Sequence, residues 1–348
     1  MTGRVARRSR PGVGLLVAAA ILATGPVAWG QESFYAGKTL RVVVGTTAGG
    51  GFDTYARTIA RHLGKHLPGQ PAIIVENMAG AGGLVAANYM FRIAKPDGLT
   101  VSTFVGSLLL SKLYDRPGAE FDALKFEYVG QPARTSPSCT FARRSGITSL
   151  DAWRAAKAKV KLGGIAPGTE LDDVARILEV ALGLPIQLVS GYKGSAEIRL
   201  AAEAGEVAGG CWTYDSVRAT WAKALESGEA VVVLQITPRP HPDLPNVPVG
   251  ITLARSDEAR QLIEAGIHAP STIYRPYLAP PGTPKDRVQL LRRAFQATMT
   301  DPEFVAEAQK ARLTVDPVSG EDLEQTIRRQ FALSPALVTR LKEILFSH

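Results

Sequence analysis

The sequence predicts an α/β protein made of two lobes of similar design. Apolar runs with strand character alternate with helical patterns along most of the chain, an order typical of parallel, doubly wound sheets. The alternation runs through two successive blocks, and the second block repeats the organisation of the first. With 348 residues, the chain is long enough for two domains and a well-buried core.

The expected domain boundaries follow these blocks. Residues 31–130 form the first block, and residues 131–270 form the second. From residue 271 the chain contributes mainly helices and few strands of its own. We therefore expect residues 271–348 to return to the first lobe and complete it.

The first thirty residues have a separate character. Four arginines precede an apolar run at residues 13–24, and small residues lie just before Gln31. This order predicts a secretory signal peptide at residues 1–30, because the apolar run is short for a membrane span. An uncleaved membrane anchor is the alternative. Its removal takes away four arginines and no acidic residue, so the formal net charge falls from +8 to +4. We therefore expect an exported protein that does not bind nucleic acid.

Two cysteines, Cys139 and Cys211, fall in expected strands of the second lobe. An exported protein meets an oxidising compartment, which permits a disulfide bond between them. Two free buried thiols are an equal alternative, because cysteine packs as a small apolar residue. Their spacing fits no metal-binding or redox motif.

The clearest motif of the first lobe lies at residues 40–53. A buried strand at residues 42–44 leads into a glycine-rich loop at residues 45–51, and apolar residues then recur at helical spacing as far as Leu67. A loop of this kind directs free backbone N–H groups and the positive end of a helix dipole toward the space above the strand. The motif therefore predicts an anion site.

The same arrangement recurs about thirty residues later, where a strand at residues 73–75 enters a second glycine-rich loop at residues 76–83. A helix is expected at residues 84–94, and further strands at residues 99–104 and near residue 129. One such loop alone is most simply a tight turn. Two loops on neighbouring strands of one lobe favour an anion site shared between them.

The second lobe and the tail show the same strand and helix signals. The expected strands cover residues 138–142, 161–165, 186–189, 206–211 and 230–236. The expected helices cover residues 149–158, 171–182, 196–204, 285–298, 301–311, 321–331 and 334–345, and a proline-rich surface loop covers residues 238–248.

Other kinds of site are not supported by the sequence. The first loop lacks the Lys-Ser/Thr pair of a P-loop after Gly51, and Val85 stands at a small-residue position of the dinucleotide fingerprint. His62 and His66 lie four apart on a helix, but the glutamate of a zinc-protease helix is missing, so we expect surface histidines and no metal. With no convincing nucleophile and base pair, we expect neither an enzyme nor a cofactor.

Several motifs together resemble the Bug-type periplasmic receptors, the solute-binding subunits of tripartite tricarboxylate transporters. The likeness spans nearly the whole mature chain, and its motifs lie at residues 44–53, 76–83, 96–100, 192–194, 243–248 and 281–284. The resemblance implies a two-lobed periplasmic binding protein of the Venus flytrap kind, with a mixed, mostly parallel sheet in each lobe. It also implies that a small organic anion binds in the cleft between the lobes.

The resemblance also implies the ligand-binding residues. The first-lobe loops are expected to hold a carboxylate through their main-chain N–H groups, with Ser107 at the next strand end and three residues from the second lobe. These residues are Thr47, Ala48, Gly49, Gly50, Gly80, Ala81, Ser107, Gly168, Thr169 and Tyr192. Asp53 is expected to cap the helix that follows the first loop, with ligand contact as the alternative.

Trp212 stands where the family usually has a segment ending in Asp. We expect it either to line the cleft beside an apolar or aromatic ligand body or to pack in the core. The expected function is a periplasmic, monomeric solute-binding protein that delivers a mono- or dicarboxylate to membrane transporter subunits. The alternatives are a receptor read by a membrane sensor kinase and, less favoured, an exported enzyme on the same scaffold.

Overall fold

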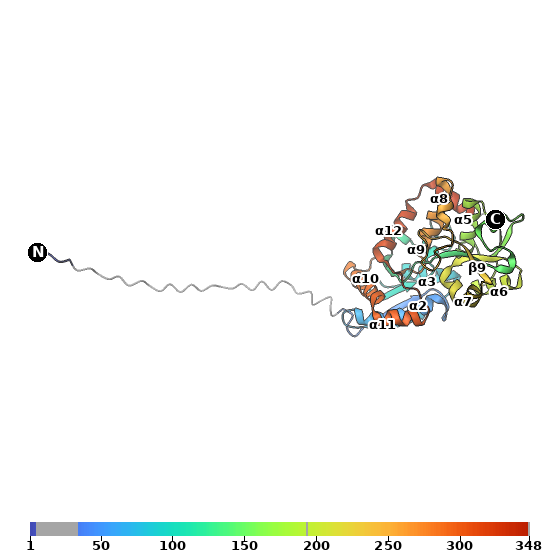
Figure 1. Ribbon diagram of the computed structural model, residues 1–348. Coiled ribbons are helices and arrows are strands. Elements are labelled where there is room, and N and C mark those ends of the chain that lie inside the picture. The colour runs from blue at the N-terminus through green and yellow to red at the C-terminus, as the bar shows by residue number, and fades with distance from the viewer. Residues whose placement is uncertain (5–33, 193, 347–348) are drawn as a thin grey trace.

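The computed structural model describes residues 1–4, 34–192 and 194–346 (Figure 1). Beyond its first four residues, the expected signal peptide therefore lies outside the described residues. Within the described ranges, no helix is both long and apolar enough to cross a membrane.

The first of two sheets has six strands in the order β11-β4-β10-β3-β1-β2. β1 pairs in parallel with β2 and β3, whereas β10 pairs in antiparallel fashion with β3 and β4. Four strands therefore run in one direction and two in the other. The bounds are β1 Thr39–Val44, β2 Ala72–Asn77, β3 Thr100–Thr103, β4 Glu127–Gln131, β10 Tyr277–Ala279 and β11 Val318–Ser319.

The second sheet has five strands in the order β7-β6-β8-β5-β9, and β5 alone runs against the others. The bounds are β5 Pro137–Ala142, β6 Val160–Gly163, β7 Ile186–Val189, β8 Gly209–Thr213 and β9 Ala230–Gln235. The expected fold class, an α/β protein with two mixed sheets, is confirmed.

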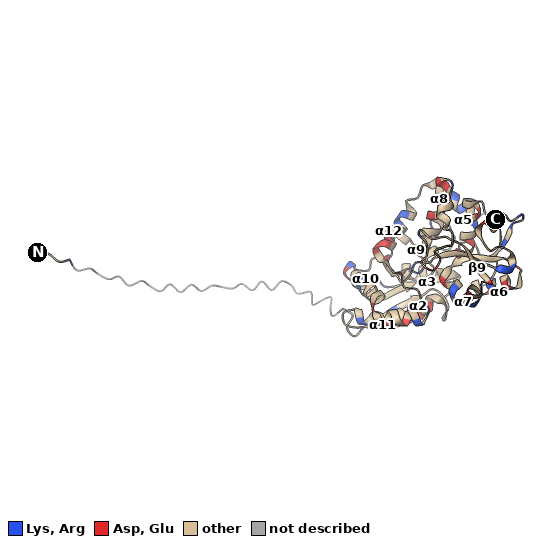
Figure 2. Cartoon of the chain, in the orientation of Figure 1, with Lys and Arg blue, Asp and Glu red and all other residues tan. Residues whose placement is uncertain are grey.

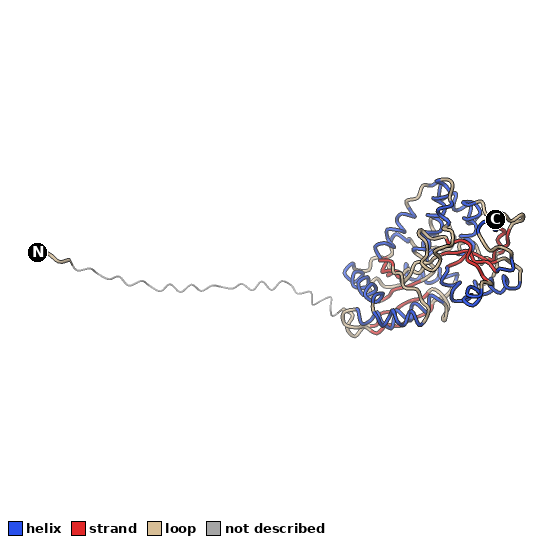
Figure 3. The backbone as a smooth tube through the Cα atoms, in the orientation of Figure 1, coloured by secondary structure: helices blue, strands red, loops and turns tan. Residues whose placement is uncertain are grey.

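Helices surround the strands on the outside of the molecule (Figure 3). Their bounds are α2 Gly51–Leu63, α3 Leu84–Arg92, α4 Leu150–Arg154, α5 Glu170–Leu182, α6 Ser195–Ala204, α7 Tyr214–Ser227, α8 Asp257–Ile263, α9 Ala269–Thr272, α10 Lys285–Thr300, α11 Pro302–Lys310, α12 Gly320–Phe331 and α13 Pro335–Phe346. Lys and Arg positions are interspersed with Asp and Glu positions along the helices in view (Figure 2).

The chain passes between the two sheets at two places. It leaves the first sheet after Gln131 and enters the second at Pro137, and it returns between Gln235 and Tyr277 through α8 and α9. The helices α10, α11 and α12 then pack on the first sheet or on α2, whereas α13 packs against α5 and α8. The end of the chain thus lies against elements of the 131–270 segment rather than against the first sheet.

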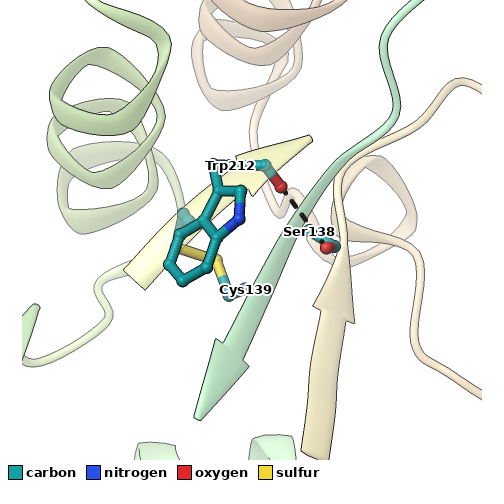
Figure 4. The surroundings of a disulfide bond; sticks show 4 residues. Ser138, Cys139 and Trp212 are labelled. Carbon is teal, nitrogen blue, oxygen red and sulfur yellow. Dashed lines mark hydrogen bonds between the residues drawn. A yellow bond between two sulfur atoms is a disulfide. The ribbon is translucent and has the colours of Figure 1, made fainter. Parts of the chain in front are cut away.

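A disulfide bond joins Cys139 of β5 to Cys211 of β8, and both residues are fully buried (Figure 4). The two cysteines face each other directly in the antiparallel register of these strands. Of the two alternatives that the sequence left open, the structure has the disulfide bond.

Candidate ligand-binding site

The first glycine-rich loop joins β1 to α2 and is exposed from Thr47 to Gly51. Gly45 has no room for a side chain, because a Cβ atom there would lie 2.7 Å from Phe104 Cβ. The amides of Thr47, Ala48, Gly50 and Gly51 have no hydrogen-bond acceptor within the described part of the chain, and no side chain caps α2. The loop therefore offers a row of free donors at the positive end of a helix.

Asp53 fixes the shape of this loop from within. Its Oδ2 accepts hydrogen bonds from Gly49 N at 2.8 Å and from Arg57 Nε at 3.0 Å, and the side chain is almost completely buried. These partners lower the pKa of Asp53 to about 2. The hydrogen bond from Arg57 has the largest effect, and those from Gly49 and Asn77 have smaller ones. Instead of capping the first turn, the carboxylate reaches back to the loop, and its oxygens already have partners inside the protein.

Asn77 joins the two glycine-rich loops. Its Nδ2 donates to Thr46 O at 3.0 Å and to Asp53 Oδ1 at 2.9 Å, while its Oδ1 accepts from Arg57 Nη2 at 2.9 Å. The contact arises because β1 and β2 are parallel neighbours that pair Val44 with Asn77. The sequence analysis did not assign this residue a role, although it lies inside a motif that carried the family resemblance.

The second glycine-rich loop lies beside the first at the same edge of the sheet. Its backbone takes positive φ angles at four successive residues, from Gly80 to Gly83. Ala81 is one of them, with φ of 45°, a conformation that is unfavourable for a residue with a Cβ atom. A Cβ atom on Gly83 would lie 3.3 Å from Gly45 O, so the two loops are in close contact.

The rim of the first sheet meets the second lobe at Ser107, which follows β3. Its Oγ donates to Gly168 O at 3.3 Å, and Gly168 N donates in turn to Asp173 Oδ1 at 2.8 Å. Thr169 Oγ1 donates to Ala166 O at 2.7 Å. Three of the expected site residues, Ser107, Gly168 and Thr169, are thus brought together where the lobes touch.

The two aromatic candidates of the second lobe, Tyr192 and Trp212, are not part of the contact between Ser107 and Gly168. Tyr192 is half-buried and packs on the core cluster formed by β8, α6 and α7. Trp212 is 1% exposed, stacks on Trp221 with ring centroids 6.0 Å apart, and lies next to the disulfide bond (Figure 4). Of the two alternatives for Trp212, cleft lining and core packing, the structure has core packing. β8 is a central strand with helices packed against it, so this side chain faces the core.

A cavity of about 180 Å³ lies where the lobes meet. Ser107 and Thr169 line it, but the residues of the two glycine-rich loops do not. Its remaining walls are mostly apolar and come from both lobes and from the returning segment: Val105, Ile165, Leu171, Val174, Gly266, Ile267, Pro270, Ser271 and Tyr274, with the acidic residues Glu170 and Asp173.

Two carboxyl groups on this cavity are poorly solvated. Burial raises the pKa of Glu170 to about 7, although Thr135 Oγ1 donates to it at 3.1 Å and Thr213 N at 3.3 Å. Burial likewise raises the pKa of Asp173 to about 7, despite the bond from Gly168 N. The charge of Arg275 near Glu170, and of Arg116 and Arg176 near Asp173, offsets only part of the effect of burial, so each carboxyl group holds a proton readily near neutral pH.

Arg275 lies in the segment that returns to the first sheet, and no motif in the sequence indicates a role for it. Its guanidinium stacks on three rings, with its carbon 4.7 Å from the Tyr274 centroid, 5.0 Å from Tyr55 and 5.3 Å from Phe52. Nη2 lies 3.7 Å from the position of a Cβ atom on Gly51. Nε is buried and has no hydrogen-bond partner.

The histidines considered as metal ligands have carboxylate partners. His62 Nε2 lies 2.7 Å from Glu307 Oε2, and His66 Nε2 lies 2.8 Å from Asp301 Oδ2. His62, Asp301 and Glu303 have donor atoms within 4.8 Å of one another. The ammonium of Lys65, however, lies 2.7 Å from both Asp301 and Glu303. The group is therefore an ion-pair network that fastens α2 and the following turn to α11.

Two α/β sheets joined by two crossovers, with exposed amides in the glycine-rich loops of the first, form the architecture of the two-lobed periplasmic binding protein fold. Residues 55–342 match the tripartite tricarboxylate transporter family receptor, and the chain belongs to that family. The family named from the sequence is thus confirmed.

Similar proteins cover nearly the full length of the chain. A UPF0065 protein encoded in the gbd 5′ region of Cupriavidus necator is 30% identical over 302 residues, which is 85% of each chain. A TctC solute-binding protein from Polaromonas superposes with a TM-score of 0.67 at 20% identity, over 88% of this chain and 99% of its own. An R. palustris protein solved with adipate superposes with a TM-score of 0.63 at 22% identity, over 88% and 97%.

Proposed function

We propose that this protein is a periplasmic solute-binding protein that captures a small organic carboxylate between its lobes and delivers it to the membrane subunits of a tripartite tricarboxylate-type transporter. The pair of adjacent glycine-rich loops carries the proposal, because their exposed amides have no acceptor in the described part of the chain. Free amides at the positive end of a helix bind an anion without adding chemistry, as a carrier requires.

The arrangement of the lobes supports capture by closure. The donors of the first lobe lie at the carboxyl ends of parallel strands, and the loop before α5 reaches the same edge from the second lobe. A ligand that contacts both lobes stabilises the form in which they are together, and such a form presents a distinct surface to a membrane partner. The R. palustris neighbour with adipate supports a carboxylate as the class of ligand.

The remaining parts of the proposal concern export and assembly. Residues 1–30 act as a cleaved signal peptide, residues 31–130 with 271–348 form one lobe, and residues 131–270 form the other. The last helix of the first lobe, α13, then reaches across to pack on α5 and α8 of the second. The protein works as a monomer that neither needs a cofactor nor transforms its ligand.

Native mass spectrometry of the freshly purified protein, followed by a thermal-shift panel of mono- and dicarboxylates, tests this function. A carboxylate at a hundredfold excess over its dissociation constant should add about 2.7 kcal/mol to the free energy of unfolding. The ligand should be recovered chemically unchanged after incubation. If amines or sugars shift the melting temperature and no carboxylate does, the proposal is wrong.

A further inference from the structure

Arg275 places a full positive charge beside the amino-terminal end of α2. Among the described residues, no carboxylate lies within ion-pair distance of its guanidinium, and Nε has no acceptor. Most other arginines near the first loop are paired, as Arg57 is with Asp53 and Arg41 with Glu76. The groups that contact the guanidinium are instead aromatic rings, which stack on it but accept none of its hydrogen bonds. Glu170 lies near enough for the charge of Arg275 to lower its pKa, although the two do not form an ion pair.

A cation is electrostatically unfavourable at the amino-terminal end of a helix, because the helix dipole already carries positive charge there. The free amides of the glycine-rich loop point into the same region, and the position of a Gly51 Cβ atom is 3.7 Å from Nη2. An anion bound at this place would accept from the amides and from the guanidinium together. It would also relieve the repulsion between these positive groups.

The cavity beside this region differs in charge. Tyr274, which stacks on Arg275, also lines the cavity of about 180 Å³. Glu170 and Asp173 line it too, and no Lys, Arg or His does. A carboxylate placed in the cavity would therefore meet two partly ionised acidic groups and no cation in the cavity wall, whereas an apolar group would meet mostly apolar walls.

We propose that Arg275 binds the ligand carboxylate together with the first glycine-rich loop, and that the ligand is a monocarboxylic acid whose uncharged remainder occupies the cavity. This inference rests on the proposed function, and it narrows the ligand class to acids with one charged end. The amides supply geometry, and Arg275 supplies the charge that holds the carboxylate when the lobes are together.

The experiment compares hexanoate with adipate, and other monocarboxylates with dicarboxylates of the same carbon number, by isothermal titration calorimetry on the full mature protein. The variants are Arg275→Gln, which removes the charge, and Arg275→Lys, which keeps it. Arg287→Gln is the matched control, because Arg287 also stacks on a ring, that of Phe34, and binds Asp97 O just before β3, away from the loops.

We expect the tightest-binding monocarboxylate to bind at least tenfold more tightly than its dicarboxylate partner. Arg275→Gln should weaken its binding about 10- to 100-fold, Arg275→Lys should restore part of the loss, and Arg287→Gln should bind as the wild type does. Unchanged affinity in folded Arg275→Gln overturns the role of Arg275, and tighter binding of dicarboxylates overturns the ligand class. If no carboxylate binds the wild type, the proposed function itself fails, and this inference fails with it.

Discussion

Ser107 Oγ donates a hydrogen bond to Gly168 O, with the two atoms 3.3 Å apart. Ser107 follows β3 of the first sheet, whereas Gly168 precedes α5, which packs against β8 of the second sheet. The bond therefore joins the rims of the two lobes directly, beside the cavity that Ser107 and Thr169 line.

Replacing Ser107 by alanine should weaken ligand binding. Loss of this bond removes about 0.5–1.5 kcal/mol from the form in which the lobes touch, so affinity should fall about 2- to 10-fold. Calorimetric titration with the best carboxylate of the panel measures the change. Ser334→Ala is the control, because its hydroxyl accepts only from Leu337 N at the start of α13. Equal affinity in the Ser107 variant and the wild type would show that the contact plays no part in binding.

Replacing Gly49 by aspartate should abolish binding of carboxylates. Gly49 has φ of 80°, which strains any residue with a Cβ atom, but open space surrounds it, so the aspartate side chain has room and places a negative charge among the free amides. Repulsion of this kind should reduce affinity about 100-fold or more. Gly282→Asp is a matched control, because Gly282 has φ of 81° and open space but precedes α10. A folded Gly49 variant that binds normally would remove this loop from the site.

Replacing Asn77 by alanine should loosen both glycine-rich loops at once. The variant loses the bonds to Thr46 O and Asp53 Oδ1, and Arg57 loses an acceptor. We expect affinity for carboxylates to fall about tenfold, with faster amide hydrogen exchange in both loops. Asn88→Ala, which breaks two bonds to the 118–120 segment, should leave binding unchanged. Unaltered exchange in the loops of the Asn77 variant would contradict this role.

Replacing Glu170 by glutamine should change the pH dependence of stability. Burial raises the pKa of Glu170 from its ordinary value of 4.5 to about 7. Between these values the folded protein holds a proton that the unfolded chain has lost, so the free energy of unfolding falls as pH rises through this window. The glutamine side chain has no such dependence. Its amide oxygen can accept from Thr213 N, and its amide nitrogen can donate to the Thr135 hydroxyl.

Urea unfolding of wild type and Glu170→Gln at pH 4, 6 and 8 measures this effect. The two proteins should be about equally stable at pH 4, and the variant should be more stable at pH 8, by on the order of 1 to 3 kcal/mol. Asp173, whose pKa is also raised to about 7, is present in both proteins and does not affect the difference. Identical pH profiles would show that Glu170 is solvated in solution.

Local sequence patterns were sufficient to predict most of the strands and the two glycine-rich loops. The strand–glycine–helix order depends on neighbouring residues alone, and the spacing of the two copies placed them on adjacent strands. The helices α7, α8 and α9 were not predicted. α7 bends at Trp221, where the backbone leaves helical geometry, and α8 leads into a π-helical turn at Glu264–His268, so neither has a long regular period.

The candidate site could be predicted from the sequence only where the backbone of the glycine-rich loops forms it. Runs of glycine indicate the two loops in the sequence. Arg275, in contrast, is separated from Phe52 and Tyr55 by more than 200 residues and belongs to no recognisable motif. For Trp212, in contrast, the sequence pattern suggested a place in the site that the structure does not give it. An aromatic residue at the end of a strand is compatible with a cleft, and only the stacking of Trp221 against it places it in the core.

The disulfide bond has a consequence for how the two lobes move. β5 is the strand by which the chain enters the second sheet, and Cys139 bonds it to β8, whose last residue, Thr213, donates to Glu170 at the start of α5. The Cys139–Cys211 bond thus cross-links two neighbouring strands beside this helix. If the lobes close on a ligand as proposed, we expect the movement to occur at the two crossovers rather than within the second sheet. Reduction of the bond would remove this cross-link and loosen β5 relative to β8.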